Sequence, residues 1–250
     1  MKISIITVAF NAEATIAEAV ASVVSQRQDG FELEYIIVDG ASTDETLAAL
    51  EPHSDGIAHI ISEPDRGLYD AMNKGVAAAT GDFIGILNAD DTYAHIGVLA
   101  AVAARLEETG ADALYGDLDY VAADGSGRVV RRWRSGEMGP RSFLRGWMPP
   151  HPTFFLAKSV YAEHGVYSLD LRSAADYELM LRMLHKHRVR ATYLPDVLVK
   201  MRTGGVSNAS WGNRLRANRE DRRAWRMNGL RPMPWTLVIK PLRKLGQWIG

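Results

Sequence analysis

Residues 83–91 read Phe-Ile-Gly-Ile-Leu-Asn-Ala-Asp-Asp, an apolar run that ends in amide and carboxylate side chains. Residues 83–87 are apolar on both parities, as in a strand that helices cover on both faces. In an open parallel sheet, ligands bind beyond the carboxyl ends of the strands. The stretch therefore predicts a buried strand and, immediately after it, one edge of a binding site.

Strands and helices alternate through the first half of the chain. Besides 83–87, the strand candidates are residues 3–8, 35–39, 58–62 and 113–115. Helices are expected over 16–24, from Ser42 to Leu50 behind a capping box of Ser42 and Glu45, over 68–79 and over 96–106. This alternation predicts an α/β fold built on a mostly parallel sheet.

The pattern changes after Asp117. Residues 123–127 are turn-prone, and residues 128–152 are first basic and then rich in proline, which indicates a hairpin and a loop. Helical periodicity returns over 174–184, and two short strands are expected between residues 190 and 201. The sequence contains no internal repeat.

Composition and missing motifs exclude several classes of protein. The 250 residues are 47% hydrophobic and 24% charged, which is typical of a globular chain of one large or two small domains and excludes disorder. The chain has no cysteine, so disulfides, thiolate zinc sites and cysteine nucleophiles are excluded. No glycine-rich loop follows the first strand, and the P-loop, nucleophile-elbow and His-Glu-x-x-His motifs are absent, which disfavours the enzyme classes that use them.

Two strand ends carry oxygen ligands. Asn88, Asp90 and Asp91 suit Mg²⁺ or Mn²⁺, which complete their shells with waters and substrate phosphates. The alternative is that Asp91 caps a helix beginning at Tyr93, and both interpretations can hold together. At the other strand end, Asp39 can accept hydrogen bonds from a base or a ribose, although such turns are common in any α/β protein.

The motifs in combination resemble those of family 2 glycosyltransferases of the GT-A fold. The resemblance rests on residues 6–11, 38–44, 65–75 and 81–91, then on 151–153, 174–179 and 204–207. It covers roughly residues 2–208. It implies a GT-A domain over 1–210, with a nucleotide-sugar-binding part over 1–117 and an acceptor part over 118–210. Residues 211–250 are expected to form a basic amphipathic helical tail.

The resemblance also implies which residues hold a nucleotide-sugar donor. They are Thr7, Ala9, Asn11, Asp39, Asp65, Arg66, Asp70, Asn88, Ala89 and Asp90. Arg66 has the alternative of a structural ion pair. The family's Asp-x-Asp appears here as Asn88-x-Asp90, so a divalent metal, Mn²⁺ or Mg²⁺, is expected on Asp90, and either its affinity falls or Asp91 shares the ligation.

Asp176 matches the family's catalytic base. Sugar transfer needs a base for the acceptor hydroxyl, and a carboxylate at a helix start can project into a cleft. Its alternative is a helix N-cap. On the acceptor side, His151, Gly205 and Ser207 are expected to contact the diphosphate or to form a lid, whereas a lone histidine is more often a packing residue.

The net charge of −1 hides two unlike regions. Residues 214–250 carry ten Lys or Arg and two acidic residues, so this tail is +8 and the remainder is −9. Tryptophans among the basic residues suit an anionic membrane surface, with packing on the acidic body as the alternative. No nucleic-acid partner is expected because no reading motif occurs. No apolar run is long enough to span a bilayer, so we expect a cytoplasmic protein, peripheral at the inner face of the membrane.

These features predict an inverting, metal-dependent glycosyltransferase. It would move a sugar from a UDP- or GDP-type donor to a glycan or lipid-linked acceptor in polysaccharide biosynthesis. Two alternatives remain open. One is a sugar-nucleotide pyrophosphorylase, which should show a glycine-rich phosphate loop after the first strand, and the other is a non-catalytic nucleotide-binding or membrane-docking subunit.

Overall fold

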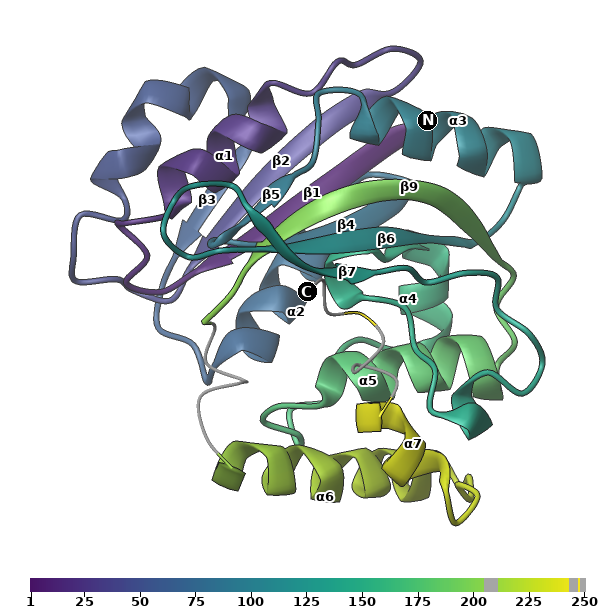
Figure 1. The fold of residues 1–250 in the computed structure, drawn as a ribbon. Helices are drawn as coiled ribbons and strands as arrows, with labels where there is room; N and C mark the ends of the chain where they lie inside the picture. The colour runs from purple at the N-terminus through teal and green to yellow at the C-terminus, as the bar shows by residue number, and fades with distance from the viewer. Residues whose placement is uncertain (205–210, 243–246, 248–250) are drawn as a thin grey trace.

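The computed structural model describes residues 1–204, 211–242 and 247, and within them nine strands form one sheet (Figure 1). The strands are β1 (Lys2–Ala9), β2 (Glu32–Asp39), β3 (His59–Ser62), β4 (Phe83–Asn88), β5 (Asp91–Tyr93), β6 (Ala113–Val121), β7 (Val129–Trp133), β8 (Phe155–Ala157) and β9 (Ala191–Arg202). Their order is β3-β2-β1-β4-β8-β6-β9-β5, and β7 pairs with β6 outside this path.

The first four strands of the path are parallel, as the sequence predicted. β1 pairs with β2 and with β4, and β2 pairs with β3. The short β8 is antiparallel to both β4 and β6, and β9 runs parallel to β6. The sheet therefore consists of a parallel half, β3-β2-β1-β4, which the antiparallel strand β8 joins to a second half.

Helices cover both faces of the sheet (Figure 1). They are α1 (Ile16–Val24), α2 (Leu68–Ala78), α3 (Val98–Thr109), α4 (Lys158–His164), α5 (Ala175–Met180), α6 (Trp211–Met227) and α7 (Thr236–Leu242). The 3-10 segments are η1 (Ala48–Gly56), η2 (Phe143–Arg145) and η3 (His151–Thr153), and π-helical η4 (Leu181–Lys186) follows α5. One buried cluster lies under α1 and α3, and the other under α2, α5 and α6.

Helix α2 lies unusually close to β1. A Cβ atom added to Gly75 would lie 2.4 Å from Cγ2 of Ile6, far inside van der Waals contact. Only glycine therefore permits this approach of helix and strand. The close packing fixes the position of the first turn of α2, which reaches the carboxyl end of the sheet.

Two predicted elements were wrong. No helix begins at Ser42, because its hydroxyl donates to Asp39 Oδ1 and accepts from the Asn11 N–H, and the 3-10 segment η1 begins only at Ala48. The alternative in which Asp91 caps a helix is not observed, because Asp91 begins β5. The two strands expected between residues 190 and 201 are one strand, β9, against which β6 shifts register at two places.

The basic C-terminal region packs on the body. In α6, Ala224 and Trp225 are fully buried, and the indole Nε1 of Trp225 donates to the hydroxyl of Tyr177 at 2.9 Å. In α7, Lys240 pairs with Asp221 at 2.7 Å. Packing on the body, which the sequence left open, is therefore present on one face of this region, and none of the described helices is long and apolar enough to cross a membrane.

Candidate functional site

The carboxyl ends of β1, β2 and β4 meet at one edge of the sheet. The register pairs Ala9 with Asp39 and Val8 with Asn88, so the three strands stop at nearly the same level. The loops that follow bring together the residues for which the sequence predicted a nucleotide-sugar site. Parallel pairing is the physical reason that segments so far apart in sequence share this edge.

The side chains of Thr7 and Asp39 lie beneath this edge and are fully buried. Thr7 Oγ1 accepts a hydrogen bond from the hydroxyl of Tyr35 at 3.0 Å. Asp39 Oδ2 accepts one from the backbone N–H of Ser42 at 3.0 Å and one from Ser62 Oγ at 2.7 Å. Both residues hold the floor of the site in shape, and Ala9, also buried, completes it.

The loop after β1 is held to the loop after β2. Asn11 has a positive φ of 48°, its backbone N–H donates to Ser42 Oγ at 2.8 Å, and its Oδ1 accepts from the Thr43 N–H at 2.9 Å. Phe10, which lies between Ala9 and Asn11 in the sequence, is 63% exposed. It is an aromatic residue at the sheet edge that the sequence analysis did not identify. Its position directly after the last buried residue of β1 could have indicated it.

Residues 65–70 form a turn stabilised by its own charges. Asp65 Oδ1 accepts from the Gly67 N–H at 2.7 Å, and Gly67 has a φ of 116°, which favours glycine. The exposed Arg66 guanidinium pairs with Asp70 at 2.7 Å, so the ion-pair alternative for Arg66 is observed. Hydrogen bonds from the Arg66 side chain and backbone lower the pKa of Asp70 below its usual range.

The two carboxylates expected to share a metal lie in different environments. Asp91 is fully buried, and its Oδ2 accepts from the amide of Asn88 at 2.9 Å. Burial raises its pKa to about 8, and the neighbouring Asp90 adds to that rise. Asp90 is half-buried beside Ala89 at the end of β4, and no described residue donates a hydrogen bond to it.

The residues present fit a divalent cation that takes one protein carboxylate. Among the described residues, no group of three or more His, Asp or Glu side chains converges as a complete cation site. Mg²⁺ and Mn²⁺ commonly accept one or two carboxylates and complete their shell with phosphates. Asp90 meets that requirement, whereas Asp91 is already held by Asn88.

Asp176 lies across from this edge, in the first turn of α5. The N-cap of α5 is Ala174, so the alternative role of Asp176 as a cap is not observed. Its carboxylate is half-buried, and Oδ1 accepts a hydrogen bond from the hydroxyl of Tyr69 at 3.1 Å. Tyr69 belongs to α2, the helix that follows the Asp65–Asp70 turn, so acceptor and donor parts are in direct contact.

His151 packs inside the protein, which agrees with the alternative interpretation of this residue. It is buried, and its Nε2 lies 2.8 Å from the hydroxyl of Tyr167. Burial lowers its pKa, and the charge of Asp176 opposes that shift more weakly. Gly205 and Ser207, the other two residues predicted for the acceptor side or lid, lie outside the described residues.

An aromatic cluster around Asp176 was missed from the sequence. The rings of Tyr69 and Tyr167 stack with centroids 5.9 Å apart, and the hydroxyl of Tyr161 lies 3.4 Å from that of Tyr167. Asn73 of α2 accepts from the Tyr167 N–H and donates to the Tyr167 carbonyl, both at 2.9 Å. Tyrosines spread over a hundred residues gave no local pattern from which this cluster could be predicted.

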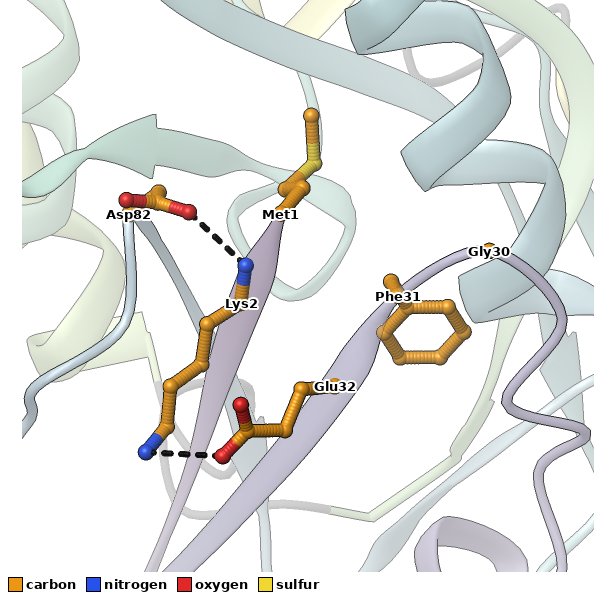
Figure 2. A pocket seen from close by; sticks show the side chains of 6 residues that line it. All are labelled: Met1, Lys2, Gly30, Phe31, Glu32 and Asp82. Carbon is orange, nitrogen blue, oxygen red and sulfur yellow. Dashed lines mark hydrogen bonds and ion pairs between the residues drawn. The ribbon is translucent and has the colours of Figure 1, made fainter.

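A shallow hollow lies at the opposite end of the sheet (Figure 2). Its lining comes from the amino ends of β1 and β2 and from Asp82, which accepts a hydrogen bond from the Lys2 backbone N–H at 2.8 Å. Lys2 Nζ pairs with Glu32 at 3.1 Å across it. None of the predicted site residues lines this hollow.

The mixed sheet, with carboxylates at its carboxyl edge, has the GT-A fold. The chain belongs to the Glycosyl transferase family 2, whose family model matches residues 4–168. It is therefore a transferase, and the pyrophosphorylase and non-catalytic alternatives are not retained.

Two relatives illustrate the family. An uncharacterized glycosyltransferase of Mycobacterium tuberculosis is 37% identical over 184 residues, which cover 72% of this chain and 68% of that protein. A PGL/p-HBAD biosynthesis glycosyltransferase of Mycobacterium bovis is 31% identical over 211 residues, which cover 82% of this chain and 78% of that one.

Solved structures share the fold at lower identity. S. aureus TarS 1–349 in complex with UDP-GlcNAc superposes with a TM-score of 0.70 at 21% identity, covering 91% of this chain and 65% of that one. A Pyrobaculum calidifontis mannosyltransferase in complex with GDP-Man and Mn²⁺ gives 0.64 at 21% identity, covering 97% and 68%. The chain thus spans just under two thirds of the TarS fragment.

Proposed function

We propose that the enzyme transfers a sugar from a nucleotide diphosphate sugar of the UDP or GDP type to a glycan or lipid-linked acceptor. The observation that carries this proposal is the contact between Asp176 and α2. It places a half-buried carboxylate of the acceptor part against the helix that follows the donor turn. The solved relatives with UDP-GlcNAc and with GDP-Man support the donor class.

The donor would occupy the edge formed by β1, β2 and β4. The predicted residues there that are exposed or half-buried are Asn11, Asp65, Arg66, Asn88 and Asp90, with Thr7, Ala9 and Asp39 as the floor. A divalent cation held by Asp90 would neutralise charge on the diphosphate. The relative with bound Mn²⁺ supports this cofactor.

Asp176 would act as the base. Its Oδ1 is occupied by the Tyr69 hydroxyl, which leaves Oδ2 to accept the proton of the acceptor hydroxyl. Attack by that hydroxyl on the face of the sugar opposite the diphosphate inverts the anomeric configuration. This route needs no covalent glycosyl intermediate.

The Asp176→Asn variant tests the base. We expect transfer to fall about 10²–10⁴-fold, the usual contribution of a general base. Thermal stabilisation by UDP-GlcNAc or GDP-Man with Mn²⁺ should persist, because the proposed role of Asp176 is toward the acceptor hydroxyl and not the nucleotide. The matched control is Asp170→Asn, an exposed carboxylate in the loop before α5, which should leave transfer unchanged. Unchanged transfer in Asp176→Asn would exclude this residue as the base.

A thermal-shift panel tests the donor and the metal. UDP, GDP, CMP and dTDP sugars are compared with and without Mn²⁺, because a ligand that binds the folded state raises its melting temperature. We expect one UDP or GDP sugar to stabilise the enzyme, and Asp90→Asn to abolish the part of the shift that depends on Mn²⁺. No shift with any donor would contradict the proposal.

We further propose that the enzyme acts at the inner face of an anionic membrane, where a lipid-linked acceptor would lie. The support is the outer face of α6, where Arg219, Arg222 and Arg226 are exposed and form no ion pair with a described carboxylate. Trp235, 49% exposed, lies just before α7 in the same C-terminal region. Basic side chains with an exposed tryptophan suit a lipid interface.

A further inference from the structure

We infer that Tyr69 is a positioning residue for Asp176: its hydroxyl fixes one carboxylate oxygen, so that the other oxygen faces the acceptor. The inference rests on the proposed role of Asp176 and extends it to a residue on the donor side. Its starting point is the hydrogen bond from the Tyr69 hydroxyl to Asp176 Oδ1, 3.1 Å long, between residues 107 positions apart.

Tyr69 is held rigidly enough to orient its partner. Its side chain is buried, and its ring stacks on Tyr167 with an interplanar angle of 18°. Asn73 lies one helical turn further along the same face of α2 and forms two hydrogen bonds to the backbone of Tyr167. A single helix therefore both contacts the carboxylate and fixes the aromatic ring that supports that contact.

The hydroxyl of Tyr69 can only be the donor. Burial, and then the charge of Asp176, raise the pKa of Tyr69 well above its usual value, so the phenol keeps its proton at any working pH. An ionised carboxylate has no proton to give and accepts only. Hydrogen bonds to charged groups are among the stronger ones in proteins, so this one can hold the carboxylate in one orientation.

The other titratable groups facing Asp176 are His151 of η3 and Tyr167 of the loop before α5. Burial lowers the pKa of His151, which keeps the imidazole neutral near pH 7. Burial raises the pKa of Tyr167 well above its usual value. Neither group places a full positive charge beside the carboxylate, and among the described residues Tyr69 is its hydrogen-bond donor.

The test compares Tyr69→Phe with Tyr161→Phe. Both changes remove one hydroxyl from the same aromatic cluster and keep the ring, but only the first removes the bond to Asp176. The full chain is labelled with ¹³C at its aspartate carboxyls, and the signal of Asp176 is identified as the one missing from Asp176→Asn. We expect its chemical shift to move in Tyr69→Phe, because the carboxylate loses its hydrogen bond, and to stay in place in Tyr161→Phe.

A rate measurement gives the second readout. With UDP-GlcNAc or GDP-Man as donor, kcat should fall about tenfold in Tyr69→Phe while KM for the donor stays the same, because a misplaced base slows the chemical step and leaves donor binding intact. An unmoved Asp176 signal in Tyr69→Phe, or an equal change in both variants, overturns the inference. The carboxyl signal needs no turnover, so it fails independently of the proposed function, which instead fails if Asp176→Asn retains full transfer.

Discussion

Asn88 takes the place of a carboxylate at the end of β4, and the structure gives it a role of its own. Its amide donates to Asp91, which is fully buried and whose second oxygen has no hydrogen-bond partner among the described residues. With a pKa of about 8, Asp91 is largely protonated near neutral pH, and a carboxylate at position 88 would place a further acidic group against it in a buried setting, where charge is costly. The Asn88 amide therefore supplies a hydrogen bond to the buried side chain of Asp91.

The sequence could predict which residues lie at this edge but not which of them are buried and which remain accessible. Four of these carboxylates lie close to the ends of strands or helices, and the hydrophobic pattern of the sequence reveals such ends. They are Asp39, Asp65, Asp90 and Asp176. Whether a carboxylate at such a boundary turns inward, as Asp39 and Asp91 do, depends on partners from distant segments. Tyr69 was missed for the same reason, since its partner lies 107 positions away.

Glu34 offers a test of pH-dependent stability. Burial favours a raised pKa, but hydrogen bonds from Ser4, Thr80 and Lys2 outweigh it and hold the pKa of Glu34 at about 2, against its ordinary value of 4.5. A pKa that is depressed in the folded state stabilises the protein above about pH 4.5, and this stabilisation is lost as the pH falls towards 2.

Glu34→Gln should therefore lower the free energy of unfolding at pH 7, and the difference from the wild type should shrink between pH 5 and pH 3. Urea denaturation at each pH measures it. Glu32→Gln is the matched control, because Glu32 is exposed and its ion pair with Lys2 contributes little. A difference that stays constant with pH would contradict the assigned shift.

At the scale of elements, the strands buried on both faces were the clearest prediction. The apolar runs near residues 3–8, 35–39 and 83–87 all became buried parallel strands, because burial on both faces leaves an unambiguous pattern. The helix expected from Ser42 failed because Ser42 hydrogen-bonds with Asp39 and Asn11 instead of capping. Local cap signals compete with tertiary hydrogen bonds that a sequence does not display.

Gly75→Ala tests the close packing of α2 on β1. Intrinsic helix propensity favours alanine by about 1 kcal/mol, yet the new Cβ would lie 2.4 Å from Ile6. We expect the steric overlap to outweigh the gain in helix propensity, so that the free energy of unfolding falls by about 1–3 kcal/mol. Transfer should also fall, since α2 carries Tyr69. Ala77→Gly, at an exposed position of the same helix, should cost about 1 kcal/mol and spare activity. A stabilised Gly75→Ala variant would show that the helix can move away freely.

At the scale of the whole molecule, the structure shows how the basic C-terminal region lies on the acidic body. The region that carries the +8 charge is attached to the body by Trp225 and by Asn228, whose amide donates to Glu178 at 2.8 Å, while the arginines on the outer face of α6 are exposed. The sequence could not choose between packing and membrane binding because they use different faces of one helix. Removing the whole region would expose buried Tyr177 and Glu178, so point changes are the sounder probe.

Arg222→Glu combined with Arg226→Glu should weaken binding to phosphatidylglycerol vesicles at least about 30-fold, taking about 1 kcal/mol for each basic residue near such a surface. Co-sedimentation at low salt measures it. The control, Arg128→Glu with Arg132→Glu, makes the same charge change on the exposed β6–β7 hairpin and should bind like the wild type. Equal binding by both variants, or no preference for anionic over phosphatidylcholine vesicles, would contradict membrane docking.

The pairing of β5 with β9 has a consequence for synthesis. Asp91 is matched with Met201, and Tyr93 with Val199, so the segment immediately after Asp90 is completed by residues more than a hundred positions later. Contacts of such sequence separation form late, because their loop must close first. As the chain leaves the ribosome, β1, β2 and β4 can assemble early, whereas the turn that presents Asp90 remains unfinished until β9 has emerged. A ribosome-bound fragment ending before β9 would hold most of the sheet without the support on which this carboxylate depends.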